Sequence, residues 1–127
     1  AERRAKPKTY ATLHFLPTAT LILEVQDKYS RSHHSDESAL SYLQKLAKIN
    51  MLLLDDLGKE KLTEDAKRAV YWLINEREMW ERPTIITSNF SLEQIDARAE
   101  AALSSRIVGM CRGCIFEFKG EDRRFSK

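Results

Sequence analysis

Hydrophobic residues in the first half of the chain recur first at the spacing of a strand and then at the spacing of a helix. Alternation of apolar and polar residues over Ala11–Leu16 predicts a strand, and apolar spacing of three or four over Thr18–Tyr29 predicts a helix. The polar stretch Ser30–Ser38 predicts a loop, in which Asp36 is placed to cap a second helix. That helix carries its apolar residues at helical spacing, at Leu40, Leu43, Leu46 and Ala47.

Two nearly continuous apolar runs in the second half predict buried strands. Ile49–Leu54 predicts a central strand covered on both faces, and Thr84–Ser88 predicts a second strand. Between them Thr63 is placed to cap a long helix that ends before Pro83, with one apolar side formed by Ala66, Ala69, Val70, Leu73 and Ile74.

The remaining elements follow the second apolar run. Ser91 and Gln94 have the spacing of a capping box at the start of a helix. Leu103–Met110 predicts a further short helix that ends at Gly109 or Gly113, and Cys114–Phe118 predicts a last strand. Strands that alternate with helices favour an α/β fold, a parallel sheet with flanking helices, in one domain over residues 1–127.

Composition and charge narrow the function only slightly. Lysine plus arginine number 21 against 19 acids, so the net charge of +2 creates no strong field for a polyanion. No apolar run is long enough to span a bilayer and no signal-type segment follows the basic start, which predicts a cytoplasmic protein without a membrane partner. Cys111 and Cys114 lack two further ligands at zinc-site spacing and are interpreted as reduced thiols.

Polar residues directly after the buried strands are the candidates for chemistry, because open parallel sheets bind ligands at the carboxyl ends of their strands. Asp55 and Asp56 follow the first run, and adjacent carboxylates suit a partly hydrated magnesium ion. Asn89 follows the second run. On spacing alone, a solvated turn or a helix cap explains the acid pair equally well.

The run MLLLDDLG (Met51–Gly58), followed by RPTIITSN (Arg82–Asn89), resembles the Walker B and sensor 1 segments of AAA+ ATPases. Their combination resembles one branch, the DnaC and DnaI helicase loaders and the IstB-type transposition helpers. The resemblance implies an ATPase in which Asp55 holds Mg²⁺, usually through water, and Asp56 either acts as base or positions the attacking water. It implies sensor 1 at Asn89, in contact with the γ-phosphate or that water, with Thr87 as a lesser contributor.

Arginines extend the resemblance toward the end of the chain. SSRIVGM resembles the arginine-finger segment, which implies that Arg106 acts on the ATP of a neighbouring subunit and that the protein self-associates; Arg112 is the fallback. FKGEDRR resembles the sensor 2 ending, with Arg124, or else Arg123, in contact with phosphate. Arg77 is instead predicted to be structural, with its charge on the last-turn carbonyls of the long helix.

A phosphate-binding loop is not found in these residues. The glycines are Gly58, Gly109, Gly113 and Gly120, and none precedes a Lys-Ser or Lys-Thr pair at the required spacing. We therefore expect a partial AAA+ core from Walker B to sensor 2, truncated at its N-terminus within a longer protein. We also expect weak ATP binding by this chain alone.

Four functions follow as hypotheses. The first is ATP-dependent loading of a DnaB-type replicative helicase on single-stranded DNA, and the second is service to a transposase as an IstB-like helper. The third is a non-hydrolysing adaptor with the same fold. The fourth, a metal-dependent nuclease, requires further acids at neighbouring strand ends, where the chain has Asn89 instead.

Overall fold

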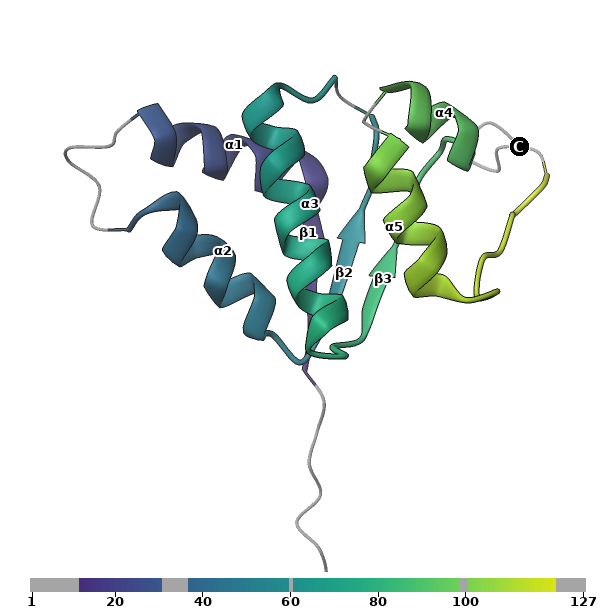
Figure 1. The fold of residues 1–127 in the computed structure, drawn as a ribbon, viewed down its shortest axis with the longest axis horizontal. Helices are drawn as coiled ribbons and strands as arrows, with labels where there is room; N and C mark the ends of the chain where they lie inside the picture. Colours follow the sequence, from purple (N-terminus) through teal and green to yellow (C-terminus); the bar gives the residue numbers. More distant parts are fainter. Residues whose placement is uncertain (1–11, 31–36, 60, 99–100, 121–127) are drawn as a thin grey trace, which may run out of the picture.

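A computed structural model describes residues 12–30, 37–59, 61–98 and 101–120, and these contain strands and helices in alternation (Figure 1). In chain order the elements are β1 (Leu13–Pro17), α1 (Thr18–Ser30), α2 (Ala39–Lys48), β2 (Met51–Asp55), α3 (Glu64–Met79), β3 (Thr84–Ile86), α4 (Leu92–Arg98) and α5 (Ala101–Cys111). Among the described residues no helix is both long and apolar enough to cross a membrane.

The three strands form one parallel sheet in the order β1-β2-β3. The parallel α/β arrangement and the central place of β2 are therefore confirmed. In the register of the sheet Phe15 lies opposite Leu53, and Leu53 lies opposite Ile85. All three strands end at the same edge, which brings the residues that follow them close together.

The hydrophobic core lies between the sheet and helices α2, α3 and α5, which pack on one of its faces (Figure 1), and it includes Leu21 and Val25 of α1. Leu52 and Leu54 of β2 point into this core and are fully buried. The apolar side predicted for α3 is confirmed, since its five predicted residues are buried: Ala66, Ala69, Val70, Leu73 and Ile74.

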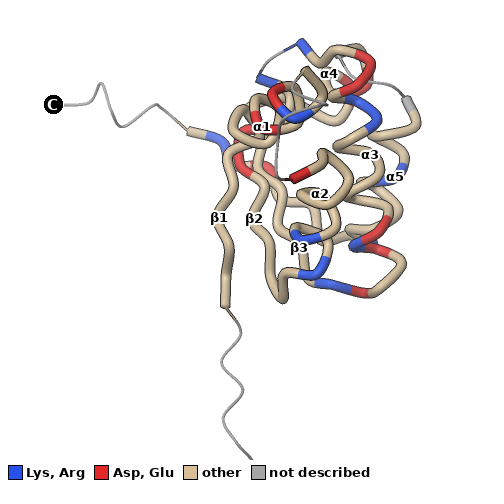
Figure 2. Tube along the Cα trace, turned by 90° about the vertical axis from the view of Figure 1, so that its left-hand side faces the viewer, with Lys and Arg blue, Asp and Glu red and all other residues tan. Residues whose placement is uncertain are grey.

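The opposite face of the sheet is covered by no described helix, as the side view of β1 and β2 illustrates (Figure 2), and we call it the open face. Phe15 is 57% exposed and Ile85 46% exposed. Met51 and Leu53 are only partly buried. The expectation that β2 is covered on both faces is therefore wrong for the face on which these two residues lie. Successive side chains of a strand point to opposite faces, and only one set meets helices here. The second predicted strand is also shorter than Thr84–Ser88, since it ends at Ile86. Ile85 is exposed because it lies beside Leu53 on the face that no described helix covers.

Two of the three helix N-caps that the sequence predicts are found in the structure. Thr63 Oγ1 accepts a hydrogen bond from the backbone N–H of Ala66 (3.3 Å), and Ser91 and Gln94 form the reciprocal bonds of a capping box. The cap of α2 is Ser38, whose Oγ accepts from Ser41 N–H at 3.0 Å, rather than Asp36, which lies outside the described residues. Ser38 is the N-cap because it directly precedes Ala39, the first helical residue.

The C-terminal part of the prediction needs correction. α5 continues through Gly109 to Cys111 and ends before Gly113, whose φ of 87° is suited to glycine. Cys114–Phe118 is not a strand, and Phe116 and Phe118 are 78% and 96% exposed. An alternating pattern forms a strand only where a neighbouring strand pairs with it, and no described strand does so. Both cysteines are free thiols.

The buried side chain of Arg77 joins α3 to α2 and β3. Its guanidinium donates hydrogen bonds to the carbonyls of Leu46 (2.9 Å), Ala47 (3.3 Å), Ile49 (2.8 Å) and Pro83 (2.8 Å), and to Thr84 Oγ1 (2.7 Å). Arg77 thus stabilises the last-turn carbonyls of α2 and not, as predicted, those of its own helix. Burial, followed by repulsion from Arg82, lowers the pKa of Arg77 to about 10, so it remains charged at neutral pH.

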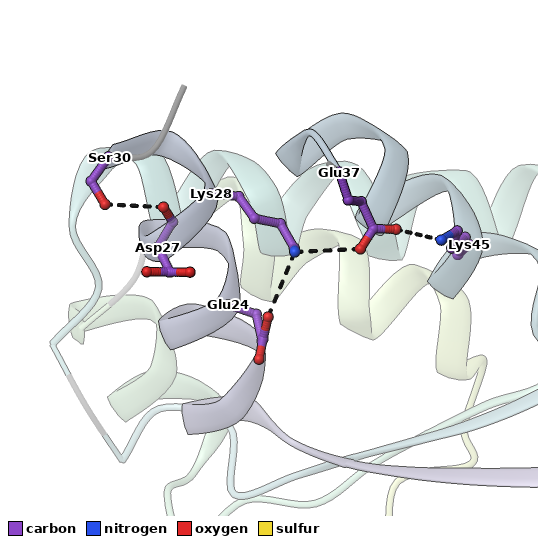
Figure 3. A network of polar contacts seen from close by, with 6 residues as sticks. All are labelled: Glu24, Asp27, Lys28, Ser30, Glu37 and Lys45. Carbon is purple, nitrogen blue, oxygen red and sulfur yellow. Dashed lines mark hydrogen bonds and ion pairs between the residues drawn. The ribbon is translucent and has the colours of Figure 1, made fainter. Parts of the chain in front are cut away.

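An ion-pair network links α1 with the start of α2 (Figure 3). Glu37 lies between two lysines, with Oε2 at 3.3 Å from Lys28 Nζ and Oε1 at 2.6 Å from Lys45 Nζ. Lys28 also lies 3.8 Å from Glu24 and 5.2 Å from the centre of the Tyr42 ring. The network joins two helices that are separated in the chain by residues 31–36.

Candidate functional site

Two threonines hold Asp55 at the carboxyl end of the central strand. Thr87 Oγ1 donates a hydrogen bond to Asp55 Oδ1 (2.5 Å), and Thr18 Oγ1 donates one to the Asp55 carbonyl oxygen (2.8 Å). Thr18 begins α1 and Thr87 follows β3, so residues after both neighbouring strands meet at β2. We call Asp55, Thr18 and Thr87 the strand-end clamp.

Asp56 occupies a sharp turn directly after β2. Its φ is 58°, in the left-handed region that aspartate tolerates better than most residues. Its N–H donates to Thr87 Oγ1 (3.1 Å), and the next N–H, of Leu57, donates to the Thr87 carbonyl oxygen (2.8 Å). Gly58 follows at a φ of 92°, where a Cβ would lie 3.3 Å from the Phe90 ring. These contacts hold the backbone of Asp56 in place, and so fix the position from which its side chain extends.

The acid pair fits a hydrated magnesium ion better than a fully protein-bound metal. The Thr87 hydroxyl donates to Oδ1 of Asp55, and the second carboxylate oxygen is left for another ligand. Among the described residues no group of three or more His, Cys, Asp or Glu side chains is gathered for metal binding. One or two carboxylates, with water and phosphate completing the shell, is a common arrangement for Mg²⁺.

A small cavity of about 130 Å³ lies beside Asp56, between the turn and the start of α1. Its walls are largely apolar and include Pro17, Ile22 and Leu62. Ligand pockets typically have volumes of roughly 300–1,000 Å³. This cavity can therefore hold water next to Asp56 but not a nucleotide.

The segment that carries Asn89 lies against the Asp56 turn. Ser88 Oγ donates to the Leu57 carbonyl oxygen (2.5 Å) and accepts from the Phe90 N–H (3.1 Å). Asn89 lies between these anchored residues, and its side chain is exposed. The structure thus brings Asp55, Asp56 and Thr87 into direct contact and holds the backbone that presents Asn89 beside them.

The predicted arginines lie elsewhere. Arg106 on α5 pairs with Glu78 in the last turn of α3, near the start of β3 (Figure 1). Because Glu64 and Glu78 are 14 residues apart in α3, that pair lies about 20 Å along the helix from the end that adjoins the Asp56 turn. Arg112 is exposed just after α5. Arg123 and Arg124 lie outside the described residues.

Three contacting residues were absent from the sequence-based site. Thr18 directly follows the first strand, so the rule that selected Asp55 and Asn89 could have found it. Tyr71 and Glu78 contact Arg106 through helix packing, for which the sequence carries no comparable signal. Thr87, predicted as a lesser contributor to sensor 1, lies at the centre of the strand-end clamp.

Solved structures place this architecture among the P-loop ATPases of the AAA+ class. DnaA from Aquifex aeolicus bound to AMPPCP superposes with a TM-score of 0.66 at 15% identity, over 76% of this chain and 29% of that one. The DnaC helicase loader superposes with a TM-score of 0.62 at 26% identity, over 76% of this chain and 56% of that one. The chain thus spans about a third to a half of the proteins it resembles.

The sequence then identifies the family. The model of the IstB-like ATP binding protein family matches residues 9–126, and the chain belongs to that family. Together with the likeness to DnaC, this confirms the predicted resemblance to the DnaC/IstB branch of AAA+ proteins. No curated protein sequence gives a significant match.

Proposed function

We propose that this chain is part of an ATP-hydrolysing switch that acts on DNA through self-assembly. The strand-end clamp supports the proposal: in a member of an ATP-binding family, a carboxylate at the end of the central parallel strand is held by a threonine that directly follows the neighbouring strand. A structural turn needs no such constraint on the carboxylate. Preorganised charge of this kind is how enzymes of this class stabilise phosphoryl transfer.

Each site residue has a distinct role in the proposal. Asp55 holds Mg²⁺ through water, with its orientation fixed by Thr87. Asp56 accepts a proton from the attacking water or orients that water, and Asn89 contacts the γ-phosphate or the same water. Arg124 contacts phosphate in the same subunit. Magnesium, when bound, supplies charge neutralisation between the phosphates.

Two biological settings have separate support. The likeness to the DnaC helicase loader favours loading of a DnaB-type replicative helicase on single-stranded DNA. The match to the IstB-like family favours service to a transposase. We prefer the helicase loader, because its solved structure shares both the fold and 26% of the aligned residues. Stimulation of ATP turnover by a DnaB-type helicase but not by a transposase would support this choice, and the reverse would support the helper.

The test is ATP turnover by the complete gene product, with and without single-stranded DNA, compared with Asp56→Asn. We expect the variant to lose about 100-fold or more of the rate, the size of a lost general base. Asparagine also tolerates left-handed backbone, so the turn should survive and the melting temperature should change little. Asp96→Asn, an exposed acid on α4, is the matched control and should leave turnover unchanged.

Absence of turnover in the unmodified protein would contradict the proposal and favour the non-hydrolysing adaptor. Full turnover in Asp56→Asn would instead remove Asp56 from the chemistry.

A further inference from the structure

An ion pair and an aromatic ring hold Arg106 against α3. Arg106 Nη1 lies 2.7 Å from Glu78 Oε2, and its guanidinium carbon lies 6.0 Å from the centre of the Tyr71 ring. Hydrogen bonds to Tyr71 and to Glu78 raise the pKa of Arg106. The two charged side chains are 37% and 34% exposed, and pairs this exposed add little to folding stability. The contact mainly decides where the guanidinium is held.

The held guanidinium lines an open groove on the outer surface of α3 and α5. The groove has a volume of about 320 Å³ and is lined by Tyr71, Glu78, Ala102, Ser105, Arg106 and Gly109. Small side chains from α5 leave the approach clear, and a Cβ added at Gly109 would meet no atom within 4 Å. A guanidinium has five N–H donors in a rigid fork, so Glu78 at Nη1 leaves donors for a second anion.

We propose that Glu78 and Tyr71 are positioning residues, which hold Arg106 facing this groove so that it completes the ATP site of a second copy of the protein. The inference rests on the proposed ATPase function. Arg106 cannot serve its own Asp55 from the far end of α3, so the anion it meets belongs to another molecule. Fixing the side chain beforehand reduces the entropy that is lost when the two copies meet.

Mixed protomers of the complete gene product test this directly. An Asp56→Asn protomer cannot hydrolyse ATP but supplies Arg106, whereas an Arg106→Ala protomer can hydrolyse ATP but depends on a supplied arginine. Each should be inactive alone, and their mixture should regain turnover. Adding Glu78→Gln to the supplying protomer should lower the regained rate about five-fold or more, as should Tyr71→Ala, through loss of the preorganised contact. Adding Glu78→Gln to the receiving protomer should change nothing.

Two controls separate positioning from folding. Glu76→Gln in the supplier makes the same charge change two residues earlier, on another side of α3, and should have no effect. Gly109→Gln in the supplier fills the groove from a helix position with free space. It should abolish the regained turnover without lowering the melting temperature.

Two results would overturn the inference while leaving the ATPase intact: undiminished turnover with Glu78→Gln in the supplier, or an equal loss when either protomer carries it. The second would mean that Glu78 is merely structural. An inactive unmodified protein would overturn the proposed function, and the inference with it.

Discussion

At the scale of single residues, one hydroxyl group organises the candidate site. Thr87 Oγ1 accepts the N–H of Asp56 and donates to the carboxylate of Asp55, so it fixes a side chain and a backbone turn together. Both contacts are partly buried, where an unsatisfied polar group costs more than it does in water. The position of the acid pair therefore depends on a residue that follows another strand.

Replacing Thr87 with valine should keep the shape of the side chain and remove both hydrogen bonds. We expect a loss of about 1–2 kcal/mol in the free energy of unfolding, because the Asp56 N–H loses its partner. ATP turnover should fall, and the Mg²⁺ concentration for half-maximal rate should rise. Urea denaturation and a magnesium titration measure these effects. Thr20→Val, at an exposed position of α1, is the control; an unchanged magnesium dependence in Thr87→Val would contradict the role of the clamp.

Replacing Arg77 with methionine should be far more damaging to stability. The variant keeps the aliphatic stem but leaves the carbonyls of the α2 terminus and of Pro83 without their donor. Each buried acceptor that is left without a partner typically costs about 1–3 kcal/mol. Urea denaturation should show this loss, whereas Arg68→Met, at an exposed position of the same helix, should stay within about 0.5 kcal/mol of the parent. Similar values for both variants would refute the structural role.

At the scale of elements, the contact between α1 and α2 depends on pH. Hydrogen bonds from Lys45, and then from Lys28, lower the pKa of Glu37 below its ordinary value of 4.5. A carboxylate with a lowered folded-state pKa stabilises the fold above its unfolded-state pKa. That stabilisation disappears as the pH falls through the lowered value.

Glu37→Gln should therefore melt at a lower temperature than the parent at pH 7, and the gap should close as the pH falls from 4.5 toward 2. High salt should also narrow the gap at pH 7, because the pairs are partly exposed. Thermal melts at several pH values measure it. Glu64→Gln, which removes a pair within α3 only, provides the comparison. A gap that persists at pH 2 would mean that Glu37 acts through packing rather than through charge.

At the scale of the whole molecule, the sheet has one covered face and one open face. Phe15, Leu53 and Ile85 lie opposite one another across the open face and form an apolar row, which we call the open row. Contiguous exposed apolar surface of this kind drives association of proteins in water.

Phe15→Lys should therefore reduce self-association of the 127-residue chain, measured by sedimentation over a range of concentrations. Because Phe15 is 57% exposed, the free energy of unfolding should change by less than about 0.5 kcal/mol. Leu23→Lys, at a 63% exposed position of α1, alters an isolated apolar residue and should leave association unchanged. Equal effects of both substitutions would mean that the open row has no special part in association.

Much of the site could be predicted because it depends on local pattern. Asp55 and Asp56 follow a central apolar strand, and the carboxyl ends of parallel strands share one edge. The contacts of Arg106 could not be predicted in the same way. Glu78 is 28 residues away in the chain, and only the packing of α5 on α3 brings the two side chains together.

The sequence by itself determined the order of elements from β1 to α5, the parallel sheet with β2 at its centre, the caps at Thr63 and Ser91, and the family. Periodicity and capping are local properties, so they can be inferred before the chain is folded. The tertiary structure alone decided that one face of the sheet is open, that Cys114–Phe118 forms no strand, and that Arg77 serves α2. Each of these depends on which segments become neighbours in space, and hydrophobic pattern does not encode that choice.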